Sequence, residues 1–161
     1  MDKITLERAE KTAAVVKKRL EPYCSKIQTA GSIRRKKPYV HDIDIVLIPS
    51  DPWNLEAEVL FLARPISPKL NGEKLKRFNY TGGVQIDLYY ATPETWATLL
   101  LIRTGSKEKN IRLCSIAKRK GWHLHADGSG LFNEKGERIA GDSEESIYEA
   151  LGLEYVEPQF R

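Results

Sequence analysis

Apolar residues recur along the chain with two spacings, which predict alternating helices and strands. Over 5–20 they stand three and four positions apart, which predicts an amphipathic helix, and a similar pattern returns over 53–63. Between these helices, the short runs 26–30 and 42–48 are apolar and bounded by turn residues, as is typical of strands. The first part of the chain is therefore expected to be a mixed α/β lobe.

A hairpin is predicted next. Strands over 74–80 and 84–90 flank a Thr-Gly-Gly turn at 81–83. Because side chains alternate across a strand, Asp87 is expected on the face opposite its apolar neighbours.

After Pro93 the chain becomes rich in helical patterns. Thr92-Pro93-Glu94 predicts the start of a helix that runs to Arg103, and a second helix is predicted over 107–120. Three short strands over 122–140 predict a small meander, and Asp142-Ser-Glu-Glu resembles a capping box that opens a last helix.

These elements predict an α/β (α+β) fold with a mixed sheet, flanking helices and a small C-terminal helix-and-hairpin subdomain. We expect two units, 1–93 and 94–161. Trp53 and Trp96 stand at apolar helical positions, so both are expected in the core.

Composition is that of an ordinary soluble globular protein, with 41% hydrophobic and 30% charged residues among 161. No apolar run is long enough to span a bilayer and no signal-peptide core is present, so we expect a cytoplasmic, monomeric protein without a membrane partner. Cys24 and Cys114 lie far apart, and His123 and His125 alternate with apolar residues in a predicted surface strand, so no zinc site is indicated.

The positive charge of the chain is concentrated in one region. The net charge is only +4, but 96–125 holds seven Lys or Arg against one acid, whereas 126–161 holds three against nine. Such a stretch is typical of a surface that follows a phosphate backbone, although a solvated helix face gives the same pattern.

Two acids, Asp42 and Asp44, stand two residues apart on a strand that is otherwise apolar. They share one face, where they repel each other unless a cation lies between them. Oxygen ligands alone favour Mg²⁺ or Mn²⁺ over Zn²⁺. The alternative is a short edge strand with solvated acids.

Phosphate-binding groups come just before these acids. Gly31 and Ser32 offer backbone N–H groups and a hydroxyl, and Arg34 and Arg35 offer guanidinium forks. Groups that donate hydrogen bonds to phosphate, next to a two-carboxylate site, indicate nucleotidyl transfer.

Four motifs together resemble the DNA polymerase X family, the beta-like polymerases, over nearly the whole chain. They are Gly31-Ser-x-Arg-Arg35 with Asp42-x-Asp44, Ile86-Asp-Leu88, Thr104-Gly-Ser-x-x-x-Asn110, and the ending Ile147 to Pro158. The resemblance implies a nucleotidyltransferase palm followed by the C-terminal polymerase subdomain, as a minimal core that starts at the first helix of the catalytic lobe.

The resemblance also implies the site residues. Asp42 and Asp44 would be ligands of two Mg²⁺ ions, for which Mn²⁺ can substitute, and Asp87 would be a ligand near the attacking 3′ oxygen. Ser32 and Arg35 would hold the β- and γ-phosphates of the incoming nucleotide.

Further nucleotide contacts follow from the same resemblance. Gly31 belongs to the phosphate turn, Lys3 would lie near the triphosphate, Thr104 to Ser106 would pass beside the sugar, and Asn110 would reach the minor-groove edge of the base. A cis peptide is implied between Gly105 and Ser106.

The implied partners are deoxynucleoside triphosphates and gapped or template-primer DNA, and the implied role is short gap filling in DNA repair. The basic residues expected to contact DNA are Arg103, Lys107, Lys109, Arg112, Lys118 and Lys120. With these contacts alone, DNA binding should be weak and depend steeply on salt.

Some positions depart from the family pattern. Relatives commonly carry Tyr-Phe where this chain has Ile102-Arg103, so aromatic packing against the sugar is absent and exclusion of ribonucleotides is expected to be relaxed. Gln85 replaces a basic residue beside the third aspartate, and Cys114 stands where some relatives use Arg.

Two other functions fit the sequence. One is a non-templated nucleotidyltransferase acting on RNA, protein or a small molecule, and the basic stretch argues against a small acceptor. The other is a catalytically idle DNA-binding module, against which the three aspartates Asp42, Asp44 and Asp87 argue.

Overall fold

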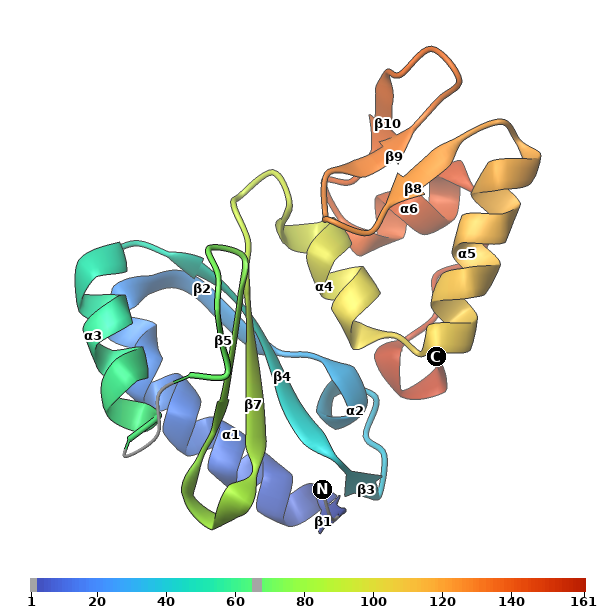
Figure 1. Cartoon of the computed structure of the whole chain (residues 1–161). Coiled ribbons are helices and arrows are strands. Elements are labelled where there is room, and N and C mark those ends of the chain that lie inside the picture. Colours follow the sequence, from blue (N-terminus) through green and yellow to red (C-terminus); the bar gives the residue numbers. More distant parts are fainter. Residues whose placement is uncertain (1–2, 65–67) are drawn as a thin grey trace.

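The computed structural model describes residues 3–64 and 68–161. In chain order, with η for 3-10 helices, the elements are β1 (Ile4–Thr5), α1 (Leu6–Leu20), η1 (Glu21–Tyr23), β2 (Cys24–Thr29), α2 (Gly31–Arg34), β3 (Tyr39–Val40), β4 (Asp42–Pro49), α3 (Pro52–Leu62), β5 (Leu70–Asn71), β6 (Leu75–Asn79), η2 (Thr81–Gly83), β7 (Gln85–Tyr90), α4 (Trp96–Thr104), α5 (Lys107–Arg119), β8 (His123–His125), β9 (Gly130–Phe132), β10 (Arg138–Ala140), α6 (Glu144–Ala150) and η3 (Pro158–Phe160). Two lobes lie side by side (Figure 1). The mixed α/β fold class is confirmed.

The first lobe is built on a five-stranded mixed sheet in the order β2-β4-β7-β6-β5. Strands β4 and β7 are parallel, and the other neighbours are antiparallel. The predicted hairpin is confirmed as β6 and β7, and α1 and α3 lie on one side of the sheet (Figure 1). This topology brings the acid-bearing strand β4 directly beside the strand that carries Asp87.

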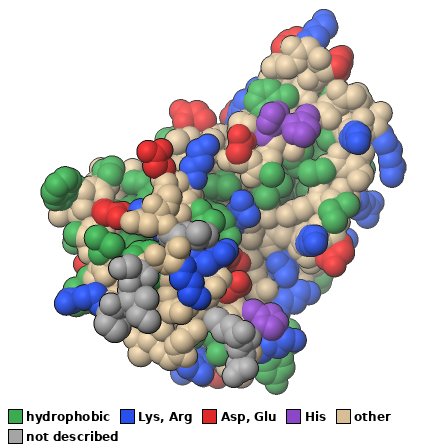
Figure 2. Space-filling model, viewed as in Figure 1, with side chains coloured by type: hydrophobic (Ala, Val, Ile, Leu, Met, Phe, Trp, Pro, Cys, Tyr) green, Lys and Arg blue, Asp and Glu red, His purple; other side chains and the backbone are tan. Residues whose placement is uncertain are grey.

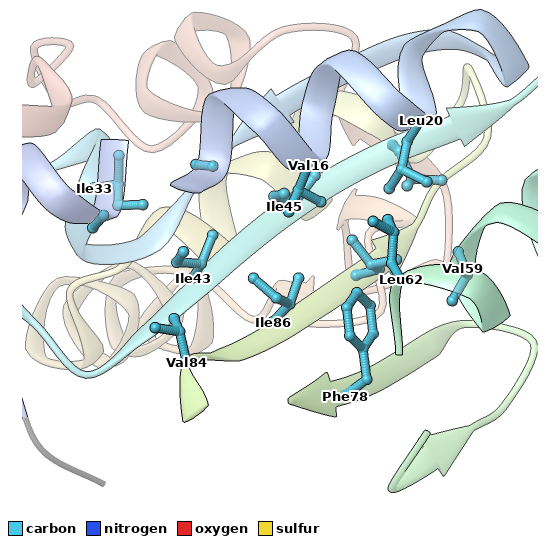
Figure 3. Packing of buried hydrophobic residues seen from close by; sticks show 14 of the residues in the cluster. Val16, Leu20, Ile33, Ile43, Ile45, Val59, Leu62, Phe78, Val84 and Ile86 are labelled. Atoms are coloured by element: carbon cyan, nitrogen blue, oxygen red, sulfur yellow. The ribbon is translucent and has the colours of Figure 1, made fainter. Parts of the chain in front are cut away.

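Alternation along β4 fixes which side chains form the core. Ile43 and Ile45 are fully buried against α1, where Val16 and Leu20 come from its apolar stripe (Figure 3). Phe78 and other side chains of the hairpin complete this core. The even-numbered residues of β4 therefore face the other side of the sheet.

That other side is covered in part by α4. Val46 and Tyr89 pack with Leu99 and Leu100 of α4 in a separate apolar cluster. The cluster contains residues from both sides of residue 93. The predicted division of the chain into the units 1–93 and 94–161 stays a prediction. Because α4 also leads into α5, it fixes the second lobe next to the acid-bearing end of the sheet.

The second lobe has its own core between α5, α6 and a three-stranded sheet in the order β10-β9-β8. This sheet is the predicted meander, and its buried side chains include Leu124 and Leu131. Strand β8 carries His123, which is exposed, and His125, which is half-buried, in keeping with the predicted surface strand.

Two local predictions were wrong in detail. Helix α4 starts at Trp96, because Thr92 and Thr95 bond to each other in a turn before it. The capping box of α6 pairs Ser143 with Ser146, one residue later than predicted.

Trp53 is not in the core. Its side chain is 85% exposed, since α3 packs through Leu55 and Val59, which project from another side of the helix. Trp96 is half-buried against the α4 cluster. Within 3–64 and 68–161, none of the helices has the length and apolar character needed to cross a membrane.

Candidate active site

The three aspartates converge on one face of the sheet. In the parallel pairing of β4 and β7, Asp44 lies directly opposite Asp87, and Asp42 lies opposite Gln85. Asp42 and Asp44 share the face of Val46, which is the face turned toward α4. The three aspartates that the resemblance implies as cation ligands therefore lie together, at the end of β4 nearest to α2.

Burial and the neighbouring carboxylates raise the pKa of Asp42 and of Asp44. Burial, followed by the charges of Asp42 and Asp87, raises the pKa of Asp44 to about 7. Burial and the charge of Asp87 also raise the pKa of Asp42 above its ordinary value. The cluster is therefore short of positive charge, although Arg103 and Arg35 act on Asp44 in the opposite direction.

Asp87 differs from the other two aspartates because its carboxylate is paired with the guanidinium of an arginine, Arg77. Its residue is only 2% exposed, and Arg77 on β6 lies opposite it in register. Nε of Arg77 donates to Oδ1 at 2.8 Å, and Nη2 donates to Oδ2 at 3.2 Å. Gln85 donates from Nε2 to the same Oδ1 at 3.4 Å. Sequence spacing gave no signal for Arg77, because strand register decides this pair.

The acids fit a divalent cation in their chemistry. Their oxygen-only donor set suits Mg²⁺ or Mn²⁺, and the raised pKa values of Asp42 and Asp44 show a charge deficit that such an ion would relieve. Across the described residues, however, no group of three or more His, Cys, Asp or Glu is arranged to hold a metal ion. Both carboxylate oxygens of Asp87 accept from Arg77 instead.

Gly31 allows α2 to approach the acids. Its φ is +57°, and a Cβ built there would lie 2.1 Å from Oδ2 of Asp44. Only glycine fits both this conformation and this approach. The turn that carries Ser32 therefore lies directly against the carboxylate of Asp44.

Arg35 lies between the two lobes. Its Nη1 donates to the carbonyl of Thr104 at 2.6 Å, and its Nη2 donates to Oγ of Ser32 at 3.4 Å. Its Nε is buried and has no hydrogen-bond acceptor among the described residues. A Cβ on Gly105 would lie 3.0 Å from Nη1. Arg35, Ser32 and the Gly105 turn thus form one polar cradle next to the acids.

Arg34 was predicted as a second side chain that donates hydrogen bonds to phosphate. In the structure it donates to Glu144 and Thr104 instead. Its Nη1 and Nη2 each donate to Glu144 at 2.7 Å, and Nη1 also donates to Oγ1 of Thr104 at 2.8 Å. Arg161 donates from Nη1 to the same carboxylate at 2.9 Å. This network joins residues 110 positions apart in the sequence, a separation at which no local pattern signals a contact.

The turn between α4 and α5 contains the implied cis peptide, at Gly105–Ser106. Ser106 caps α5 by accepting from the N–H of Lys109 at 3.4 Å. Asn110 donates from Nδ2 to the carbonyl of Ile102 at 2.8 Å, so its amide is anchored to the end of α4.

Arg103 acts on the charge of Asp44, and Lys3 comes just before the strand that pairs next to β4. The guanidinium of Arg103 lies over the ring of Tyr89, 4.3 Å from its centroid, and ties α4 to β7. Lys3 is exposed and precedes β1, whose Ile4 pairs with Val40 just before β4. The nucleotide contact expected of Lys3 and the DNA contact expected of Arg103 stay predictions.

The basic residues of α5 divide between two flanks of the helix, because about 3.6 residues complete a turn. Lys107 and Lys118 line one groove together with Ile111. Lys109 and Arg112 line a different one. Lys and Arg side chains gather along this edge of the second lobe (Figure 2). The sequence predicted one basic surface, whereas the helix presents two.

Three comparisons relate the chain to known proteins. The protein-family model described as DNA polymerase beta thumb matches residues 99–161. The DNA polymerase/3'-5' exonuclease PolX of Bacillus subtilis (strain 168) is 30% identical over 140 residues, which is 84% of this chain and 24% of that protein. The chain therefore spans 24% of the length of the curated relative that it matches.

A solved structure shares the fold. The crystal structure of Leishmania infantum polymerase beta, a ternary P/T complex, matches with a TM-score of 0.83 and 20% sequence identity. The match covers 99% of this chain and 77% of the other. At this identity the likeness establishes the fold.

Proposed function

Because this chain belongs to the polymerase X family, we propose that it adds deoxynucleotides to a DNA 3′ hydroxyl under the direction of a template. The observation that carries the proposal is the convergence of Asp42, Asp44 and Asp87 on one face of parallel strands, beside the cradle of Ser32 and Arg35. Short gap filling during DNA repair is the role that we propose for this activity.

In this proposal Asp42, Asp44 and Asp87 hold divalent cations, Mg²⁺ or Mn²⁺. Such ions, when bound, neutralise phosphate charge and make the attacking hydroxyl a better nucleophile. The carboxylates themselves would supply fixed negative charge beside the cradle. Burial on the sheet limits the water that competes for these positions.

The cradle would receive the triphosphate of the incoming nucleotide. Among residues 3–64 and 68–161, the buried Nε of Arg35 has no acceptor, as expected of a donor that would bind an anion. Ser32 and the backbone from Thr104 to Ser106 line the same space, and Asn110 and Lys3 are assigned to the edges of the nucleotide.

DNA would lie across the basic edge of the second lobe. Arg103 is next to the acids, where the primer end must come, while the two flanks of α5 offer separate sets of cations. Side chains of this kind meet phosphates and give little sequence preference.

A panel of acceptors tests the proposal. Purified protein with Mg²⁺ is given gapped DNA, template-primer DNA, single-stranded DNA or RNA, with each dNTP alone and then all four. We expect extension only on the two templated DNAs, with the complementary nucleotide. Addition without regard to the template would support a non-templated transferase, and binding of DNA without any addition would support an idle binding module.

A further inference from the structure

We propose that Arg77 is the resident counter-ion of Asp87 and that a divalent cation must displace it to gain this carboxylate. The inference rests on the proposed function, in which Asp87 is a cation ligand. It assigns a role to a residue of β6, a strand that contributes nothing else to the site.

The geometry of the pair is that of a two-point fork. Arg77 and Asp87 are opposite each other in the β6–β7 register, with separations of 2.8 Å and 3.2 Å between their paired atoms. Both oxygens of Asp87 are used, and Oδ1 also accepts from Gln85. A carboxylate held in this way has one orientation and fewer lone pairs left for a metal.

The three aspartates differ in whether a basic side chain forms an ion pair with them. In the described part of the chain, Arg77 makes an ion pair with Asp87, whereas neither Asp42 nor Asp44 has a Lys or Arg within ion-pair distance. Asp87 is also the most buried, at 2% exposure. Without a cation it would carry the largest desolvation cost of the three, so it is the acid that needs a resident partner.

Arg77 is placed to leave without opening the core. Its side chain is 34% exposed, whereas that of Asp87 is 3% exposed. The guanidinium can therefore move into solvent while the carboxylate stays in place. A divalent ion carries twice the charge of the guanidinium, so the exchange keeps Asp87 neutralised.

The test is equilibrium binding of Mn²⁺, followed by electron paramagnetic resonance of the free ion. Arg77→Gln should bind Mn²⁺ about tenfold more tightly than the unchanged protein, because one charge-assisted contact no longer competes. Lys74→Gln is the matched control, since it removes one positive charge from an exposed position at the far end of the same hairpin. It should bind like the unchanged protein.

Two further variants locate the effect. Arg77→Lys keeps the charge and loses the fork, so its affinity should lie between the other two, and it carries the test if circular dichroism shows that Arg77→Gln does not fold. In an Asp87→Asn background, Arg77→Gln should change Mn²⁺ affinity less than twofold.

The outcomes separate the two proposals. Equal or weaker Mn²⁺ binding by Arg77→Gln, with binding by the unchanged protein intact, overturns the role of Arg77 and leaves the proposed function standing. If neither protein binds Mn²⁺, the assignment of the acids as cation ligands fails, and the role of Arg77 fails with it.

Discussion

At the scale of single residues, the site combines groups that are unfavourable for folding. Asp44 is half-buried beside two other carboxylates, and its burial and their charges raise its pKa to about 7. Gly31 occupies a left-handed conformation against the same carboxylate. Arrangements of this kind are typical of sites retained for chemistry.

Replacing Asp44 by Asn should stabilise the protein and abolish its activity. The change removes charge repulsion from Asp42 and Asp87, so in buffer with EDTA at pH 8 the free energy of unfolding should rise by about 0.5–2 kcal/mol. Thermal and urea unfolding measure it. Glu94→Gln, an exposed acid near α4, is the control and should change neither property. A destabilised Asp44→Asn would contradict the electrostatic account.

Replacing Gly31 by Ala should remove nucleotide addition while the protein stays folded. The new Cβ would meet Oδ2 of Asp44 at 2.1 Å, so Asp44 or α2 must move, and the positive φ adds about 1–2 kcal/mol of strain. Gly72→Ala is the matched control, because its nearest atom would lie at an ordinary 3.5 Å. Comparable extension rates for the two variants would show that the approach of α2 to Asp44 is unimportant.

At the scale of elements, the sequence predicted most of the fold. Alternation placed Ile43 and Ile45 in the core, and the same alternation put Asp42 and Asp44 together on the opposite face. It could not show that Val46 is also buried, because that burial depends on α4, which packs from the other lobe. Trp53 was misplaced because an apolar side chain in a short helix does not reveal which side faces the sheet.

Contacts between distant elements escaped the sequence for the same reason. Arg77 reaches Asp87 through strand register, and Arg34 reaches Glu144 across the lobes. A single sequence contains the charges but not their pairing. The acids of the site and the groups that donate hydrogen bonds to phosphate were therefore predictable from the sequence. The ion pairs that Arg77 and Arg34 form were not.

The two flanks of α5 should contribute differently to DNA binding. One double variant, Lys107→Gln with Lys118→Gln, and another, Lys109→Gln with Arg112→Gln, each remove two positive charges. A flank that contacts duplex phosphates should flatten the slope of log affinity against log salt by about 0.9 unit per lost contact. We expect the larger change for the Lys107 and Lys118 pair, because its groove also holds Asn110.

Fluorescence anisotropy of labelled template-primer DNA over a range of salt concentrations measures both slopes. The second double variant serves as the charge-matched control for the first. If both slopes equal that of the unchanged protein, α5 is a solvated helix and DNA binding must be assigned elsewhere.

At the scale of the whole molecule, the two lobes are joined by buried charge. Burial alone would raise the pKa of Glu144, but its hydrogen bonds and ion pairs with Arg34 and Arg161 outweigh burial and hold that pKa below the ordinary 4.5. This contribution to stability is present above the ordinary pKa and is lost as the pH falls through the lowered value. The coupling of the lobes should therefore weaken in acid.

Replacing Glu144 by Gln should cost about 3 kcal/mol or more at pH 7, because the guanidinium groups of Arg34 and Arg161 would remain buried without a carboxylate. The difference from the unchanged protein should shrink as the pH falls below 4.5. Urea unfolding at several pH values tests this. The exposed Glu137→Gln is the control, and a difference that stays constant with pH would exclude Glu144 as the titrating link.

The most direct test of the account is single-turnover addition of one complementary dNTP to template-primer DNA with Mg²⁺, comparing the unchanged protein with Asp87→Asn and Glu94→Gln. We expect addition by the unchanged protein and by Glu94→Gln, and a loss of at least about a thousandfold in Asp87→Asn, as is typical when a group that acts on the reacting atoms is removed. Asp87→Asn that adds nucleotide at the rate of the unchanged protein would contradict the assignment of this sheet face as the catalytic site.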